Sequence, residues 1–285
     1  MYQPQILVTE PSRDYELIDS GEGEKLERFG SYVISRPDPQ ALWKKGLPKT
    51  EWGKACASFN NKWQVRVKIP DNWQVELGGL NFEVGLNPFK HVGVFPEQAS
   101  NWGWIKKQVS GKSGARILNL FGYTGGATLA SAKSGASVTH VDASKAAITW
   151  AKGNAKRSGL ENRPIRWILD DAKTFMKREV RRSNHYEGII LDPPAFGRGA
   201  KGEVWKIERD LIPLLDLCFE VLSEKPALFL LSGYASGYSA ISYKQNILYL
   251  KEKFGGEIES GELAIKESKS PRLLPAGIFA RWSAP

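Results

Sequence analysis

The stretch RILNLFGYTGGATLASAKSGASVTHVD, residues 116–142, contains an apolar strand, a short helix and a second strand in immediate succession. Within it, "RILNLF" and "SVTHVD" have the apolar runs of buried strands, and "GGATLASAKSG" between them is typical of a helix. The alternation continues outward through the later strand-like runs "PIRWILDD", "YEGIILDPP" and "PALFLLSG". Strand–helix alternation of this length predicts an α/β fold with a mostly parallel sheet covered by helices on both faces.

The two ends of the chain differ from this pattern. The final runs "EIESGELAI" and "GIFARWS" have no helix between them, which predicts an antiparallel last strand. The first 90 residues hold short alternating runs such as "WQVRVKI" and "LNFEVGL", separated by turn residues, and predict a small, mainly antiparallel β region. We therefore expect two domains, 1–90 and 91–285. The core of the first is expected to be built on four tryptophans, Trp43, Trp52, Trp63 and Trp73.

Length and composition restrict the class of protein. The chain has 285 residues, of which 41% are hydrophobic and 25% charged, as in globular proteins. The sequence contains no run of about 18 apolar residues, so no membrane span is predicted. The first residues lack the pattern of a secretory signal. Two cysteines make neither a disulfide framework nor a zinc site by themselves, so we expect a cytoplasmic protein without a metal.

The charge is unevenly distributed along the chain. The formal net charge is +9, yet residues 1–90 contain 12 Lys+Arg and 12 Asp+Glu. Residues 91–285 hold the remaining 28 of 40 basic and 19 of 31 acidic residues. A basic surface in this part would attract a polyanion such as nucleic acid, although a solvated basic surface without a partner has the same composition.

The residues that follow each predicted strand are the candidates for a site, because ligands of such sheets bind at the carboxyl ends of the strands. The first strand is followed by Gly122, Gly125 and Gly126, which permit a tight turn and close backbone approach to a ligand. The pattern is neither the G-x-G-x-x-G dinucleotide fingerprint nor a P-loop. A plain strand–helix connection is the alternative.

Acidic residues follow the second and third strands. Asp142 comes 20 residues after Gly122, a spacing that favours a carboxylate accepting both ribose hydroxyls, and the alternative is that Asp142 or Ser144 caps the next helix. After the third strand, Asp171 is our candidate for contact with an adenine amino group. In the alternative, Asp170 and Asp171 both cap the helix.

The fourth strand ends in "DPPAFGRG", residues 192–199. Prolines fix the backbone and leave carbonyls without neighbouring N–H donors, so Asp192 and the carbonyl of Pro193 or Pro194 could accept hydrogen bonds from one exocyclic amine. Phe196 could stack on a base. Such a corner could hold an amine and direct its lone pair, and a site of this kind acts through positioning and electrostatics.

Taken together, "LNLFGYTGGATLASAKSGASVTHVDASKAAITWAKGNA", "LDDAKTF" and "HYEGIILDPPAFGRG" resemble the class I S-adenosylmethionine-dependent methyltransferases. More narrowly, the chain resembles the ribosomal-RNA large-subunit methyltransferase-like family over about residues 15–283. The resemblance implies a Rossmann-like sheet, S-adenosylmethionine as cofactor and RNA as partner. It also implies roles for particular residues. The implied cofactor-binding residues are Phe121, Gly122, Tyr123, Thr124, Gly125, Asp142, Ala143, Asp171 and Ala172. The implied acceptor site comprises Asp192, Pro193, Pro194, Ala195 and Phe196, and the loop after it would offer Arg198 and Lys201 to phosphate.

Two features depart from related patterns. In the amine-methylating pattern an aromatic residue directly follows the two prolines, whereas here Ala195 intervenes before Phe196, which leaves other ring positions open. Methylation of cytosine C5 requires a cysteine thiolate, and neither "DPPAFG" nor "LLSGYASGYS" contains one. Cys218 lies among leucines and is expected in the core, so we argue against that mechanism.

The sequence therefore predicts an S-adenosylmethionine-dependent methyltransferase acting on a base nitrogen in RNA, most simply ribosomal RNA, through a pocket that admits an unpaired or flipped base. A methyltransferase for a small molecule or a protein is the first alternative. An RNA-binding protein with a relic cofactor fold is the second. The target nucleotide, the methylated atom and the oligomeric state stay open.

Overall fold

The computed structural model describes residues 4–88, 90–112, 114–199, 202–234 and 237–285. The chain clusters into two units, each assembled from separate parts of the sequence. Unit 1 comprises Met1–Ile6, Asn101–Glu262 and Gly277–Pro285, and unit 2 comprises Leu7–Ser100 and Leu263–Ala276. A division into domains at residue 90 stays a prediction.

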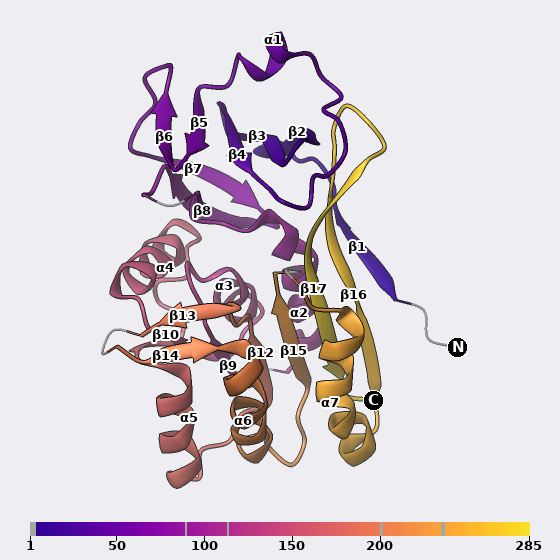
Figure 1. The fold of residues 1–285 in the computed structure, drawn as a ribbon. Helices are drawn as coiled ribbons and strands as arrows, with labels where there is room; N and C mark the ends of the chain where they lie inside the picture. The colour runs from indigo at the N-terminus through magenta and orange to yellow at the C-terminus, as the bar shows by residue number, and fades with distance from the viewer. Residues whose placement is uncertain (1–3, 89, 113, 200–201, 235–236) are drawn as a thin grey trace. The chain divides into compact units, whose positions relative to one another are not determined.

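The larger sheet has eight strands in the order β1-β16-β17-β15-β12-β9-β10-β11 (Figure 1). In chain order its strands are β1 (Gln5–Thr9), β9 (Arg116–Leu120), β10 (Ser137–Asp142), β11 (Ile165–Leu169), β12 (Gly188–Leu191), β15 (Leu228–Gly233), β16 (Glu257–Lys266) and β17 (Leu273–Ser283). Strands β15, β12, β9, β10 and β11 pair in parallel, and β17 pairs antiparallel with β15. The predicted α/β fold with a mostly parallel sheet and an antiparallel last strand is confirmed.

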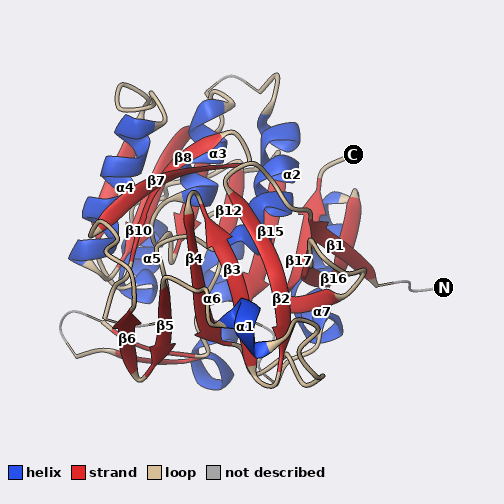
Figure 2. Cartoon of the chain, turned by 90° about the horizontal axis from the view of Figure 1, so that it is seen from above, coloured by secondary structure: helices blue, strands red, loops and turns tan. Residues whose placement is uncertain are grey.

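Helices cover both faces of this sheet, as seen from above in Figure 2. The helices α2 (Ala99–Val109), α3 (Gly126–Lys133) and α4 (Lys145–Arg157) lie on one face, and α5 (Ala172–Arg181), α6 (Ile207–Glu220) and α7 (Ala240–Phe254) lie on the other. None of the helices in the described ranges is long and apolar enough to cross a membrane.

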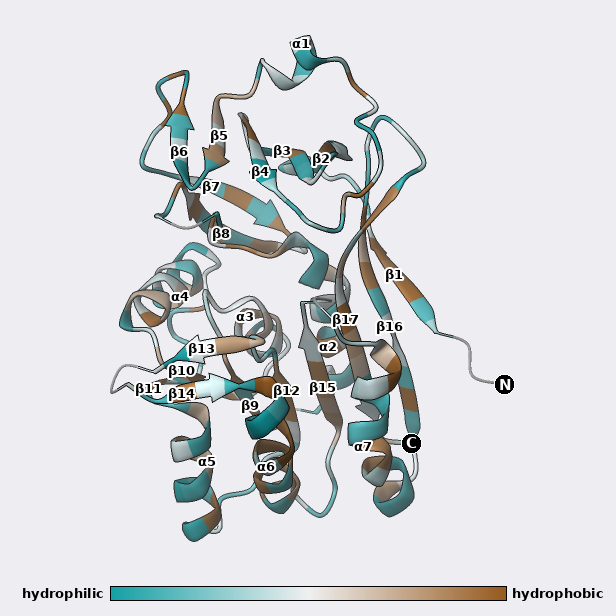
Figure 3. Cartoon of the chain, viewed as in Figure 1, coloured by the Kyte–Doolittle hydropathy of each residue, from teal (hydrophilic) through white to brown (hydrophobic). Residues whose placement is uncertain are grey.

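Burial on both faces explains why the central strands are mostly apolar. All four residues of β12 and all six of β15 are buried, and Figure 3 shows the hydrophobic colour over the lower part of β15. The core beneath α5, α6 and α7 includes Phe175, Leu214, Phe229 and Trp282. Cys218 is fully buried in the same core, as predicted, and burial raises the pKa of its thiol well above the usual range. Its side chain is therefore a packing residue.

Unit 2 is built from short strands. Its five-stranded sheet has the order β2-β3-β4-β5-β6, and β7 and β8 form a separate antiparallel pair. The bounds are β2 (Tyr15–Gly21), β3 (Glu24–Phe29), β4 (Tyr32–Pro37), β5 (Ala57–Asn60), β6 (Lys62–Val65), β7 (Asn72–Leu77) and β8 (Leu80–Gly85), with two short helices, α1 (Lys49–Trp52) and η1 (Pro96–Gln98). Only β4 and β5 pair in parallel among these strands, so the mainly antiparallel β region is confirmed.

The prediction that four tryptophans build the core of this region is wrong for three of them. Trp52 is buried, whereas Trp43, Trp63 and Trp73 are only partly buried. Their indole N–H groups donate to the backbone carbonyls of Ser20, Asn87 and Phe29 at 3.0, 2.7 and 2.9 Å. An indole has an apolar body and a polar N–H group, and these three rings lie where both are satisfied. Among the described residues of unit 2, the fully buried aromatic residues are Tyr15, Phe29 and Phe82.

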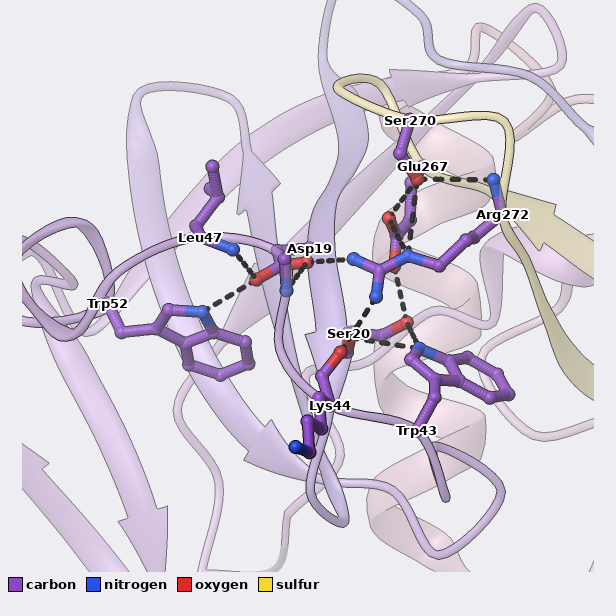
Figure 4. Close-up of polar contacts among 10 residues, drawn as sticks. Asp19, Ser20, Trp43, Lys44, Leu47, Trp52, Glu267, Ser270 and Arg272 are labelled. Atoms are coloured by element: carbon purple, nitrogen blue, oxygen red, sulfur yellow. Dashed lines mark hydrogen bonds and ion pairs between the residues drawn. The ribbon is translucent and has the colours of Figure 1, made fainter.

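A buried ionic cluster ties the two segments of unit 2 together (Figure 4). Arg272 lies between the carboxylates of Asp19 and Glu267, whose side chains are each 1% exposed, and its Nε is 2.8 Å from Glu267 Oε2. Asp19 Oδ2 also accepts hydrogen bonds from the Leu47 amide and the Trp52 indole, both at 2.8 Å. Charges removed from water require such partners, so Arg272 is the residue on which both carboxylates depend.

Candidate active site

Four segments expected to form a site emerge at the same edge of the larger sheet. Because β9 pairs in parallel with β10 and β12, Leu120 lies opposite Val141 and Leu191. Asp142 lies opposite Leu169 on β11. The residues that follow these strand ends, from Phe121, Ala143, Asp170 and Asp192 onward, therefore leave the sheet side by side.

The turn after β9 has an unusual backbone. Phe121 and Tyr123 have φ of 56° and 45°, and Gly125 has φ of 96°. Non-glycine residues in this left-handed region cost about 1–3 kcal/mol each, and such strain concentrates at functional sites. Gly125 is the N-cap of α3 and has no side chain with which to cap the helix, so the first amides of α3 receive no cap from that position.

Two glycines of this turn have no room for a side chain. A Cβ on Gly122 would lie 2.4 Å from the His140 ring, and a Cβ on Gly126 would lie 2.4 Å from the Trp102 ring. His140 is fully buried, and burial lowers its pKa to about 3, so the ring is neutral. Its Nδ1 is 2.9 Å from Oγ1 of Thr128, a residue of α3. The turn is thus fixed by packing against rigid rings.

Asp142 connects this turn to the next helix. Its Oδ2 accepts a hydrogen bond from the Tyr123 amide and its Oδ1 one from the Ser144 amide, both at 2.8 Å. Burial raises the pKa of the carboxyl group, and the two amides oppose that shift. The cap of α4 is Ser144, whose hydroxyl accepts from the Ala147 amide at 3.2 Å. Each carboxylate oxygen has a further lone pair, so a ribose role for Asp142 stays compatible with these contacts.

The acids after β11 both have local roles. Asp171 is the N-cap of α5, and its Oδ1 accepts from the Thr174 amide at 2.8 Å. Asp170 forms an ion pair with Arg178 and accepts a hydrogen bond from the Asp171 amide. Ala172 is buried at the first position of α5. Capping uses one oxygen of Asp171, and the other oxygen could still accept a hydrogen bond. Contact between Asp171 and an adenine amino group therefore stays a prediction.

The corner after β12 holds a carboxylate in an apolar setting. Burial raises the pKa of Asp192 to about 6, and a hydrogen bond with Ser232 at the end of β15 opposes that shift. Pro193 is buried, whereas Pro194 and Ala195 are exposed. Phe196 is 54% exposed, as a ring that stacks on an incoming base would be before binding. A carboxyl group with this pKa can hold or release a proton near neutral pH.

The segment after this corner was expected to be a loop, and that expectation is wrong for the residues that form two short strands and the start of α6. Residues Phe196–Arg198 (β13) and Val204–Lys206 (β14) form an antiparallel pair in which Gly197 lies opposite Trp205. The pair ends directly in α6, and the Ile207 amide donates to the Ala195 carbonyl at 3.1 Å. Pairing satisfies backbone groups that a loop would leave to water. Arg198 is an exposed residue of β13, and Lys201 lies outside the described residues.

Sequence reasoning missed Trp205. Its indole N–H donates to the Pro194 carbonyl at 2.6 Å, and its ring meets the Phe121 ring edge-on with centroids 5.1 Å apart. One buried side chain thus contacts both the turn after β9 and the acceptor corner after β12. An aromatic residue close after a proline-rich corner is a weak signal, because only the pairing of β13 with β14 brings it back to that corner.

The described residues contain no group of three or more His, Cys, Asp and Glu side chains placed to hold a metal ion. The candidate residues instead present amides, carboxylates and aromatic rings. Such groups can bind a nucleoside and orient an amine.

Comparison with known proteins places this arrangement in a family. The family model for S-adenosylmethionine-dependent methyltransferases matches residues 59–222. The structure of an S-adenosylmethionine-dependent methyltransferase from Agrobacterium tumefaciens is 43% identical, covers 99% of this chain and 94% of its own, and superposes with a TM-score of 0.94.

Two curated relatives are similar over a shorter region. The ribosomal RNA large subunit methyltransferases K/L of Hahella chejuensis and Pseudomonas paraeruginosa are 35% and 32% identical over 162 and 163 residues. Each match covers 56% of this chain, and the chain spans only 22% of the length of each relative. The family model covers more than half of the chain, and the Agrobacterium protein matches nearly all of it. The chain belongs to the S-adenosylmethionine-dependent methyltransferases.

Proposed function

We propose that this methyltransferase transfers a methyl group to a base nitrogen in RNA, most simply ribosomal RNA, and that the corner from Asp192 to Phe196 holds the base. The observation that carries the proposal is the half-buried Asp192 carboxyl group, which lies beside two prolines and an exposed aromatic ring. Its pKa of about 6 suits a group that accepts a proton near neutral pH.

We assign the cofactor to the neighbouring strand ends. The turn Phe121–Gly125 would enclose the methionine part, Asp142 with Ala143 would hold the ribose, and Asp171 with Ala172 would face the adenine. The lack of room for a Cβ at Gly122 and Gly126 supports this assignment, because close backbone approach to a ligand requires a turn of fixed shape. When bound, S-adenosylmethionine supplies an electrophilic methyl group on sulfur.

The chain's own residues would act on the acceptor. The Asp192 carboxylate and a proline carbonyl would accept hydrogen bonds from the base amine and so direct its lone pair. The Pro194 carbonyl already accepts one hydrogen bond from Trp205, which fixes its direction and leaves one lone pair. Phe196 would stack on the base. After transfer the nitrogen carries one excess proton, which the ionised Asp192 can accept.

RNA is the proposed acceptor for two reasons. Two curated relatives, whose alignments cover 56% of this chain, are named ribosomal RNA large subunit methyltransferases. In addition, all of the excess positive charge lies in residues 91–285, which would favour association with a polyanion. Because ribosomal RNA is cytoplasmic in bacteria, we also propose a cytoplasmic location.

Tritium-labelled S-adenosylmethionine tests the acceptor directly. The protein would be incubated with naked large-subunit RNA, small-subunit RNA, transfer RNA and assembled subunits, each in parallel with an Asp192→Ala variant. Label in one RNA that is lost in the variant is the expected result. Cofactor binding without label in any RNA, together with label in a small molecule or protein, would contradict the proposal.

We expect Asp142→Asn to weaken S-adenosylmethionine binding about 10- to 100-fold, corresponding to loss of a charged hydrogen bond of about 1.5–3 kcal/mol. The amide also places a donor against one of the Tyr123 and Ser144 amides. Isothermal titration with S-adenosylmethionine measures the change. Ser144→Ala is the matched control: it removes the helix cap, lowers stability by about 1 kcal/mol and leaves affinity within about twofold. Equal loss of affinity in both variants would mean that Asp142 acts only through the helix.

We expect Trp205→Phe to lower kcat about 10- to 100-fold with little change in cofactor affinity. The variant keeps a ring against Phe121 but removes the N–H donor that holds the Pro194 carbonyl. Single-turnover kinetics and cofactor titration separate the two effects. Phe121→Leu is the converse control, since it keeps that hydrogen bond and is expected to weaken cofactor binding instead. An unchanged kcat in Trp205→Phe would rule out a positioning role.

A further inference from the structure

A groove of about 410 Å³ lies at the edge of the larger sheet opposite the candidate active site. Its lining includes Arg116, Ser137 and Ile165, which are the first residues of the adjacent parallel strands β9, β10 and β11. The candidate active site follows the last residues of the same strands. The groove is therefore a separate site within unit 1.

Two exposed guanidinium groups border this groove. Arg116 is centred 5.2 Å from the Tyr186 ring, and Arg166 is centred 6.0 Å from the Phe175 ring of α5. Across the described residues, neither guanidinium has a carboxylate partner in an ion pair. Other arginines of the chain, including Arg178, Arg209 and Arg272, do form ion pairs with carboxylates.

The carboxylates near the groove accept hydrogen bonds from groups other than the two guanidinium groups. Glu187 accepts a hydrogen bond from the backbone amide of Arg116 at 2.6 Å. Glu179 is fully buried and accepts from the Tyr186 hydroxyl at 2.6 Å and from the Asn184 side chain at 2.9 Å. These bonds hold the Tyr186 ring rigidly. The groove thus has a fixed aromatic wall and two cations available to a ligand.

We propose that this groove binds a phosphodiester of the RNA strand that flanks the target nucleotide, an inference that rests on the proposed function. Arginine forms paired hydrogen bonds with phosphate oxygens, and a guanidinium held over an aromatic ring loses little freedom when it does so. Thr139 and Ser137 add hydroxyl groups to the lining. The groove contributes affinity and register, and it carries no base specificity.

The separation of the two sites sets the length of RNA required. Tyr186 and Asp192 are six residues apart along the β12 segment, which spans roughly 20 Å at about 3.3 Å per residue. Because helices cover both faces of the sheet, the RNA must pass around it, so a stacked strand needs at least about six nucleotides at about 3.4 Å each. An RNA that ends within about three nucleotides of the target would therefore occupy only the active site.

The test compares Arg116→Gln/Arg166→Gln with Lys251→Gln/Lys253→Gln, which removes two exposed charges from α7. Binding of a labelled RNA with long flanks is measured by anisotropy over a range of salt concentrations. In the arginine variant we expect the dissociation constant to rise about tenfold and the slope of its logarithm against log salt to fall by about 1.4. The lysine control and cofactor affinity change little.

A short RNA completes the test. On it the arginine variant and the wild-type protein are expected to bind equally. An arginine variant that matches the lysine control on long RNA would overturn the inference, as would an equal loss on short and long RNA. Labelling distinguishes this from failure of the proposed function: if the wild-type protein binds RNA through the groove but methylates none, the proposed function fails and the groove stands. If it binds no RNA, both fail.

Discussion

Replacing Asp192 with alanine is expected to lower kcat for methyl transfer by about 10²–10⁴-fold while cofactor binding persists. Alanine removes both the acceptor that directs the base amine and the group that receives its proton. Asparagine keeps a carbonyl acceptor but cannot take the proton, so Asp192→Asn is expected to retain more activity than alanine. Asp216→Asn, at an exposed acid of α6, is the control and should leave turnover unchanged.

The pH profile provides a sharper signature of the same carboxyl group. Burial raises the pKa of Asp192 to about 6, so its ionised form is depleted as the pH falls below that value. The logarithm of kcat/KM should therefore fall with unit slope below about pH 6. This acidic limb should disappear in Asp192→Asn. It should move to higher pH in Ser232→Ala, because the hydrogen bond from Ser232 lowers the pKa. If the fall in kcat/KM at low pH persists in Asp192→Asn, a group other than Asp192 is responsible for it.

Stability should change in the opposite direction to activity. The pKa of Asp192 in the folded state lies above that of an unfolded chain, so ionisation destabilises the fold as pH rises from about 4 to about 6. At pH 8 Asp192→Asn should therefore stabilise the protein by about 1–3 kcal/mol, and the difference should vanish below about pH 4. Denaturant unfolding at both values measures this. A loss of stability at pH 8 would contradict the burial of an unfavourable charge.

Replacing Arg272 with alanine is expected to destabilise unit 2 by about 3–5 kcal/mol. Asp19 and Glu267 are each 1% exposed, and loss of the guanidinium would leave both carboxylates buried without their cation (Figure 4). Denaturant unfolding followed by tryptophan fluorescence is informative, because Trp52 donates to Asp19 and Trp43 donates to Ser20, whose hydroxyl group donates to Glu267.

The matched control for this prediction is Arg13→Ala. Arg13 also pairs with two carboxylates, those of Asp14 and Glu76, but its side chain is 78% exposed. Water replaces such contacts readily, so this variant should unfold almost as the wild-type protein does. Equal effects of the two substitutions would show that burial of the carboxylates contributes nothing to the stability of unit 2.

The sequence predicted the parts of this protein that depend on local pattern. Strand and helix periodicity in residues 116–142 and beyond predicted the parallel sheet, since apolar spacing directly reflects which faces are buried. Parallel strands carry their ends to one edge, so the positions of Gly122, Asp142 and Asp192 at that edge followed from the same pattern. The resemblance of these segments predicted the family, which the comparisons confirm.

Only the tertiary structure decided which partners these residues have. Trp205 reaches Pro194 because β13 and β14 pair, and Arg272 reaches Asp19 across 253 positions of sequence. The raised pKa of Asp192 likewise arises from its burial in the folded protein. The periodicity of a short segment indicates whether a side chain is buried. It does not indicate which residues that side chain contacts, because those contacts depend on pairing between segments far apart in the sequence. The topology of the sheet could therefore be predicted from the sequence, whereas the contacts and the pKa values of the site residues could not.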